Sequence, residues 1–178
     1  MRQLAPSVFM LLLFCGCGST QQVDVSYDAD ANKTSYQTRS YTVSSFSGAS
    51  LGSSKSISLR AIAQCLGKEC TPERIQLVFS AGGSQELSLS GLDGEIVAGN
   101  QRITWSGKEA STGGVPSANN RVINVVGRFA VVDITLDEAE AIYSASNLQG
   151  SIGGTNLDLG TGVKSGIHNL LQNMNGTH

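Results

Sequence analysis

The sequence predicts an α+β domain: an antiparallel sheet or sandwich of about eight strands, with two helices near the C-terminus. Three observations lead to this prediction. Short segments of alternating apolar and polar residues recur along the chain, separated by glycine-rich turns. Charged residues make up only 15% of the chain, whereas Gly, Ser, Thr and Asn are abundant. The last third then changes to the apolar spacing that is typical of amphipathic helices.

The first 16 residues have the composition of an export signal. Arg2 gives a positive start, and residues 4–14 form an apolar core of about eleven residues, shorter than the roughly 20 that a spanning helix needs. The core ends in Phe14-Cys15-Gly16-Cys17. This segment resembles the lipobox of bacterial lipoproteins, in which a cysteine after a small residue is acylated and becomes the mature N-terminus. Gly16 and Cys17 fit that pattern, whereas Phe14 and Cys15 differ from the commoner residues.

The lipobox resemblance implies a division of the chain into three parts. Residues 1–16 are the signal peptide, and residues 17–35 comprise the lipidated Cys17 and a polar, flexible tether. Residues 36–178 form a single β-rich domain with a helical C-terminal part. Because Gly18 rather than Asp follows Cys17, the resemblance implies an outer-membrane anchor, with the domain facing the periplasm or the cell surface. An ordinary cleaved signal and a soluble secreted protein remain the alternative.

Two cysteines remain when the signal is removed and Cys17 carries lipid. Cys65 and Cys70 enclose a short segment, and we expect them to form a disulfide in an oxidising envelope compartment. A zinc site would need two further ligands with their own spacing, but the chain has only His168 and His178. We therefore predict a disulfide and no metal site.

Strands are expected at short intervals through the first two thirds of the domain. Alternation predicts strands over residues 36–45 and 56–64, with Ile57, Leu59, Ala61 and Ala63 on one face of the second. Residues 75–79 and 87–89 form a hairpin around the glycines of 81–84, and residues 95–98 and 103–105 form another. The second hairpin has a Gly99-Asn100 turn, in which glycine accepts a positive φ.

A long strand and two helices are predicted to complete the domain. Residues 121–136 are apolar on both faces, which predicts one central strand covered on both sides, with a bend at Gly127. Thr135-Leu-Asp-Glu138 is a capping box that starts a helix. A small hairpin around Gly153-Gly154 precedes a last amphipathic helix over residues 163–174. This succession resembles the tails of uncharacterised exported bacterial proteins, and that resemblance carries no functional residues.

Residues 108–120 are the longest stretch without a period. Long loops in compact domains are usually either functional or disordered. This loop lies between Trp105, the only tryptophan, and Arg121, and it begins with Lys108 and Glu109. These four residues are the candidate ligand- or partner-binding loop, and a plain connection without function is the alternative.

The motifs of the common enzyme and cofactor classes are missing or incomplete. Gly48-Ala-Ser50-Leu-Gly52 matches a nucleophile elbow in spacing, but a polar segment precedes it and no helix follows directly. Residues 28–32 copy the start of a calcium loop, but Lys33 replaces its glycine and Arg39 its bidentate glutamate. No Walker or dinucleotide-binding glycine pattern follows a strand, so we predict no cofactor.

The sequence therefore favours a non-enzymatic function. We expect a lipid-anchored envelope protein that binds a partner protein or glycan, or supports assembly of an envelope complex. A small periplasmic hydrolase or carbohydrate-binding domain that uses Trp105 is the competing class. Nucleic acid is excluded as a partner, because basic residues do not cluster and removal of Arg2 with the signal makes the net charge of −2 more negative.

Overall fold

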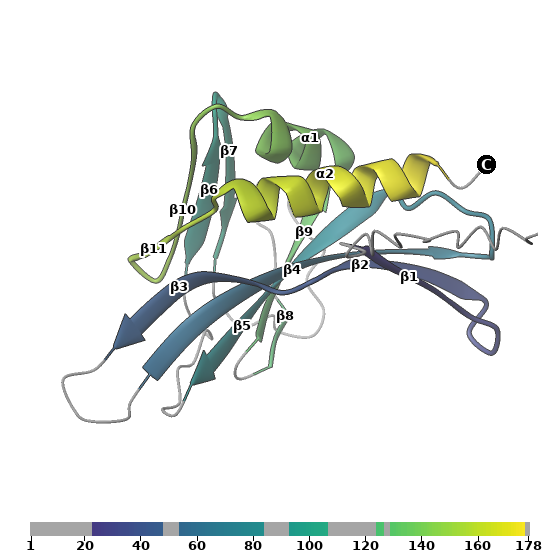
Figure 1. Ribbon diagram of the computed structural model, residues 1–178, viewed down its shortest axis with the longest axis horizontal. Helices are drawn as coiled ribbons and strands as arrows, with labels where there is room; N and C mark the ends of the chain where they lie inside the picture. The colour runs from purple at the N-terminus through teal and green to yellow at the C-terminus, as the bar shows by residue number, and fades with distance from the viewer. Residues whose placement is uncertain (1–22, 48–53, 84–92, 107–123, 127–128, 177–178) are drawn as a thin grey trace, which may run out of the picture.

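The computed structural model describes residues 23–47, 54–83, 93–106, 124–126 and 129–176 (Figure 1). These residues form eleven strands and two helices. The strands make a seven-stranded and a four-stranded sheet, and every strand pair is antiparallel. The predicted class, a mainly antiparallel sandwich-like α+β domain with two C-terminal helices, is confirmed.

The seven-stranded sheet, called the large sheet below, has the order β1-β2-β4-β5-β9-β8, and β3 also pairs with β4. Its strands are β1 (Val23–Asp28), β2 (Lys33–Thr38), β3 (Tyr41–Ser47), β4 (Ser54–Leu66), β5 (Arg74–Gly83), β8 (Asn124–Val126) and β9 (Phe129–Thr135). The predicted alternation in β4 and β5 is confirmed, because every second residue from Ile57 to Ala63 and from Ile75 to Phe79 is buried.

β4 is long enough to pair with two strands along the same edge. Its second half pairs with β2 and its first half with β3. At the break between them, the Thr38 hydroxyl accepts a hydrogen bond of 3.0 Å from the backbone N–H of Ala61, in place of a ladder bond. The predicted single strand over residues 36–45 is therefore wrong, since β2 ends at Thr38 and β3 starts at Tyr41.

The four-stranded sheet, called the small sheet below, has the order β11-β10-β6-β7. Its strands are β6 (Gly94–Ala98), β7 (Gln101–Trp105), β10 (Leu148–Ile152) and β11 (Thr155–Leu157). The predicted Gly99-Asn100 turn is confirmed: Ala98 pairs with Gln101, and Gly99 has φ +60°. The predicted hairpin around Gly153-Gly154 is also confirmed, with both glycines at positive φ.

The two helices follow the predicted signals. α1 (Leu136–Ser144) begins with a complete capping box, in which the Thr135 hydroxyl accepts from the Glu138 N–H at 3.2 Å and the Glu138 carboxylate accepts from the Thr135 N–H at 2.8 Å. α2 (Thr161–Asn175) buries the predicted apolar stripe of Val163, Ile167, Leu170, Leu171 and Met174. No helix in the described residues has the length and apolar character needed to cross a membrane.

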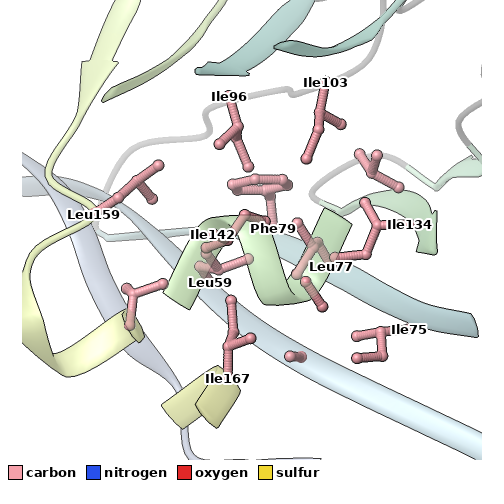
Figure 2. Packing of buried hydrophobic residues seen from close by; sticks show 14 of the residues in the cluster. Leu59, Ile75, Leu77, Phe79, Ile96, Ile103, Ile134, Ile142, Leu159 and Ile167 are labelled. Carbon is pink, nitrogen blue, oxygen red and sulfur yellow. The ribbon is translucent and has the colours of Figure 1, made fainter. Parts of the chain in front are cut away.

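Both helices and the small sheet pack on the same face of the large sheet, called the inner face below (Figure 1). Figure 2 shows Phe79 of β5 in the middle of the core, with Ile96 and Ile103 of the small sheet on one side and Leu59 and Leu77 on the other. Phe79 is fully buried. The core therefore joins the two sheets and the helices in one cluster.

Residues 23–35, predicted to belong to a flexible tether, instead form β1 and the start of β2. Val23, Val25 and Tyr27 alternate with polar residues, and β1 pairs with β2 along its whole length. The segment that resembles a calcium loop is the turn between these strands, where Asp28 Oδ1 accepts from the N–H groups of Asp30 and Ala31 at 3.0 Å. The hairpin was not predicted because the polar residues of this turn interrupt the alternation of its strands. Residues 17–22 of the predicted tether lie outside the described part of the chain.

Two other predicted elements differ from the structure. Residues 124–126 and 129–135 are two strands that pair with each other, so the single strand over residues 121–136 is wrong. The outer face of β9 is not covered, because Phe129 is 47% exposed and Asp133 is exposed.

The glycines at 82 and 83 continue β5 and pair with β4 instead of forming a turn. Residues 84–92, which include the predicted partner strand 87–89, lie outside the described part.

The predicted disulfide joins Cys65 at the end of β4 to Cys70, with an S–S distance of 2.09 Å. The loop that it closes is attached to the β1–β2 turn. The Gly67 N–H donates to the Asn32 carbonyl at 2.8 Å, and the Thr34 hydroxyl donates to the Gly67 carbonyl at 2.6 Å. The disulfide therefore fixes one end of the large sheet.

Replacement of both Cys65 and Cys70 by serine should lower the free energy of unfolding by about 2 kcal/mol, because so short a loop restricts the unfolded chain only modestly. The rest of the sheet should stay folded. Urea denaturation of the oxidised protein and the variant measures the difference. A variant that fails to fold, or one as stable as the parent, would contradict this account.

Candidate functional site

Of the predicted binding-loop residues, only Trp105 belongs to the described part of the chain. It is the last residue of β7. Lys108, Glu109 and Arg121 lie outside the described residues, as do the predicted lipidation site Cys17 and the serine elbow at Ser50. The site is therefore built from Trp105 and the described residues around it.

Trp105 belongs to the hydrophobic core and lies at the end of the small sheet. Its side chain is 4% exposed and stacks on Phe79, with 5.5 Å between ring centroids and 25° between ring planes. The indole Nε1–H is buried and has no hydrogen-bond acceptor among the residues that the structure describes. A buried donor without a partner costs about 1–3 kcal/mol, so native proteins rarely keep one without a reason.

Gly94 is directly opposite Trp105 in the β6–β7 ladder. A Cβ atom at Gly94 would overlap Cζ2 and Cε2 of the indole and would lie 2.8 Å from Nε1. The indole therefore lies across the bare backbone of Gly94, which places Nε1 beside that residue. Only glycine at position 94 leaves room for the ring in this position.

A hollow of about 400 Å³ is present at this end of the small sheet. Trp105 and Gly94 line it together with polar residues: Asp93, Glu95, Thr104, Ser106 and Ser151. Ser151, Glu95 and Thr104 are neighbours across β10, β6 and β7, so their side chains share one face of the sheet. Trp105 and Gly94 alternate with these residues and face the buried side of the sheet. The hollow thus combines two carboxylates and three hydroxyls beside the strand ends at which the indole is buried.

The charge of the hollow is negative. Asp93 and Glu95 are both acidic, and Arg102 forms an ion pair with Glu95, at 2.5 Å between Nη1 and Oε2. Lys and Arg do not line the hollow itself, as far as the described residues show. A phosphate, sulfate or carboxylate ligand would meet these carboxylates and be repelled, whereas a neutral hydroxylated ligand would meet both donors and acceptors.

Two other hollows of the described surface are lined by side chains that contact other residues of the fold. One of about 650 Å³ lies beside the disulfide, where Gln76 Nε2 donates to Asp133 Oδ1 at 3.1 Å. Another, of about 320 Å³, lies between the helices and is lined by His168. The His168 ring packs against Tyr143 at 4.8 Å, and Lys164 Nζ donates to the Ala145 carbonyl at the end of α1.

Among the described residues, the second buried side-chain polar atom without a hydrogen-bond partner is the Tyr41 hydroxyl. It points at the backbone of Gly166 in α2, where an added Cβ would overlap it. The hydroxyl is therefore buried because β3 packs closely against α2 at this point. Among the described residues, no three His, Cys, Asp or Glu side chains come close enough together to hold a metal ion.

Comparisons of the chain with protein-family models, with curated proteins and with solved structures found no match. The function is therefore argued from the geometry of the hollow and from the N-terminal sequence.

Sequence analysis selected Trp105 but not Asp93, Gly94, Glu95 or Ser151. The first three could have been found from the Gly99-Asn100 turn. A two-residue turn that pairs Ala98 with Gln101 puts Gly94 opposite Trp105, four pairs further along. Ser151 comes from β10, more than 40 residues further along the chain, and no local signal places it beside β6.

Gly94→Ala should lower the free energy of unfolding by about 1–3 kcal/mol, because the added methyl group displaces the Trp105 ring from the core. Gly162→Ala in α2 is the matched control, since its Cβ would meet only the Tyr41 ring at ordinary contact distances of 3.4 and 3.5 Å. Urea midpoints and the fluorescence maximum of Trp105 measure both variants. Equal stability of the two variants would show that the Trp105 ring does not pack directly against the backbone of Gly94.

Proposed function

We propose that this protein is a non-enzymatic, lipid-anchored binding module of the bacterial cell envelope. Its working site is the hollow at the end of the small sheet, and its ligand is a neutral glycan. The observation that carries the proposal is the set of two carboxylates and three hydroxyls that line one hollow.

The polar groups of the hollow match the chemistry of sugar hydroxyls. A sugar hydroxyl can donate to Asp93 or Glu95 and accept from Thr104, Ser106 or Ser151.

The envelope location rests on the lipobox-like N-terminus and agrees with the rest of the chain. Acylation of Cys17 would hold the domain at the outer membrane, where envelope glycans are abundant. The Cys65–Cys70 disulfide suits an oxidising compartment outside the cytoplasm. The alternative ligand is a partner protein of the envelope, and the binding experiment below distinguishes it from a glycan.

A glycoside hydrolase is the second candidate, because Asp93 and Glu95 both line the hollow. Enzymes of that class use two carboxylates on opposite sides of the bond that is cleaved. Here Glu95 is already paired with Arg102, which favours a binding role for this carboxylate. Shortening of an oligosaccharide during incubation with the protein would favour the enzyme.

Neutral oligosaccharides should bind the mature protein, and their sulfated counterparts should bind more weakly. Thr104→Ala and Ser151→Ala should each lower the affinity about fivefold, because one neutral hydrogen bond contributes about 1 kcal/mol. Ser165→Ala, at an exposed position of α2, is the control. Titration calorimetry against both sugar sets measures the affinities. Absence of sugar binding, or equal affinity of all three variants, would reject the glycan site and leave a protein partner.

Cys17→Ser should release the protein from the membrane fraction of its bacterial host, because it removes the attachment point of the lipid chains. Cys15→Ser should leave the protein in the membrane, since that residue belongs to the signal. Fractionation and mass spectrometry of the N-terminal peptide measure both variants. A soluble, non-acylated native protein would remove the anchor from the proposal.

A further inference from the structure

The proposed anchor lies very close to the folded domain. β1 begins at Val23, so only residues 18–22 separate it from Cys17. A fully extended chain spans at most about 3.3–3.6 Å per residue, which keeps Val23 within about 20 Å of the acylated residue. This inference rests on the proposed acylation of Cys17. Under that condition, the start of β1 is held within about 20 Å of the lipid-carrying residue.

β1 is amphipathic, and its two faces differ in charge. Val23, Val25 and Tyr27 point to the inner face of the large sheet, because they pair with Thr38, Tyr36 and Thr34. Val25 is 38% exposed and Tyr27 is 42% exposed, although both residues are on the face that is buried elsewhere. The carboxylates of Asp24 and Asp28 alternate with them and point to the other face.

The helix that lies beside β1 on its apolar side carries no carboxylate. α2 packs against β1 and β2 and has no Asp or Glu in its sequence. Its exposed residues near the C-terminus, Gln172, Asn173 and Asn175, are neutral. An anionic lipid surface would therefore approach this side of β1 without repulsion from α2.

We propose that β1 is the membrane-facing strand of the anchored protein, and that Val25 and Tyr27 contact the headgroup region of a phospholipid bilayer. The side chain of tyrosine suits this region because it has an apolar ring and a polar tip. The apolar area involved is small, but a short tether gives the contact a millimolar effective concentration, so weak affinity is sufficient. The opposite face, with Asp24 and Asp28, is turned away from the lipid.

This orientation separates the two interaction surfaces of the molecule. β1 and the small sheet are different parts of the described fold, since β1 ends the order of the large sheet and does not pair with the small one (Figure 1). A protein strand that adds to the edge of β1 is the competing occupant. It would use the backbone of β1 and has no need for exposed apolar side chains on one face.

The experiment uses the full acylated protein in vesicles that contain brominated phospholipids, which quench nearby tryptophan. Tyr27→Trp adds a reporter on β1. Phe129→Trp adds one at a comparably exposed aromatic position on β9, which is separated from β1 by three strands and lies on the outer face. Trp105 is present in every variant and gives a common background. We expect the added signal of Tyr27→Trp to fall about twofold and that of Phe129→Trp to change little.

A third variant tests whether the tether causes the contact. Insertion of about 20 Gly and Ser residues between Gln22 and Val23 allows the domain to move away from the bilayer, and should remove the quenching of Tyr27→Trp. Equal quenching at positions 27 and 129, or no quenching at position 27, overturns the inference when mass spectrometry shows an acylated Cys17. A non-acylated Cys17 overturns it together with the proposed anchor, while the glycan site remains testable by calorimetry.

Discussion

Burial of the large sheet on one face only is the constraint on which the rest of the structure depends. Its strands are apolar at every second position, so a single face must be covered to exclude water. α1, α2 and the small sheet together cover that face except at Val25 and Tyr27 of β1, and Phe79 is in contact with the small sheet through Trp105. The position of the small sheet, and with it the hollow, follows from this shared core.

The same constraint explains the position of Trp105. One face of the indole must fill the space above Phe79, which fixes the ring in the core. The ring is nevertheless larger than that space and extends across the backbone of Gly94 to the end of the small sheet. Packing against Phe79 and Gly94 thus fixes the indole, and its position needs no support from the polar residues that line the hollow.

Elements with a clear local signal could be predicted from the sequence. The alternation in β4 and β5, the Gly99-Asn100 turn and the Thr135 capping box all depend on residues close together in the chain. β1 was missed because its alternation is short and a polar turn follows it. The division between β2 and β3 depends on a side-chain bond from Thr38 to Ala61, 23 residues away. The hollow likewise needs Ser151, which only the packing of β10 on β6 brings to the site.

The disulfide also bears on how the chain would fold if it is exported as proposed. Cleavage of the signal would remove Cys15, and a thioether at Cys17 has no thiol left to exchange. Cys65 and Cys70 are then the only two thiols, so oxidation has a single product and no scrambled isomer to repair. If the chain is exported as proposed, it would need an oxidant to form this bond but no disulfide isomerase to correct it.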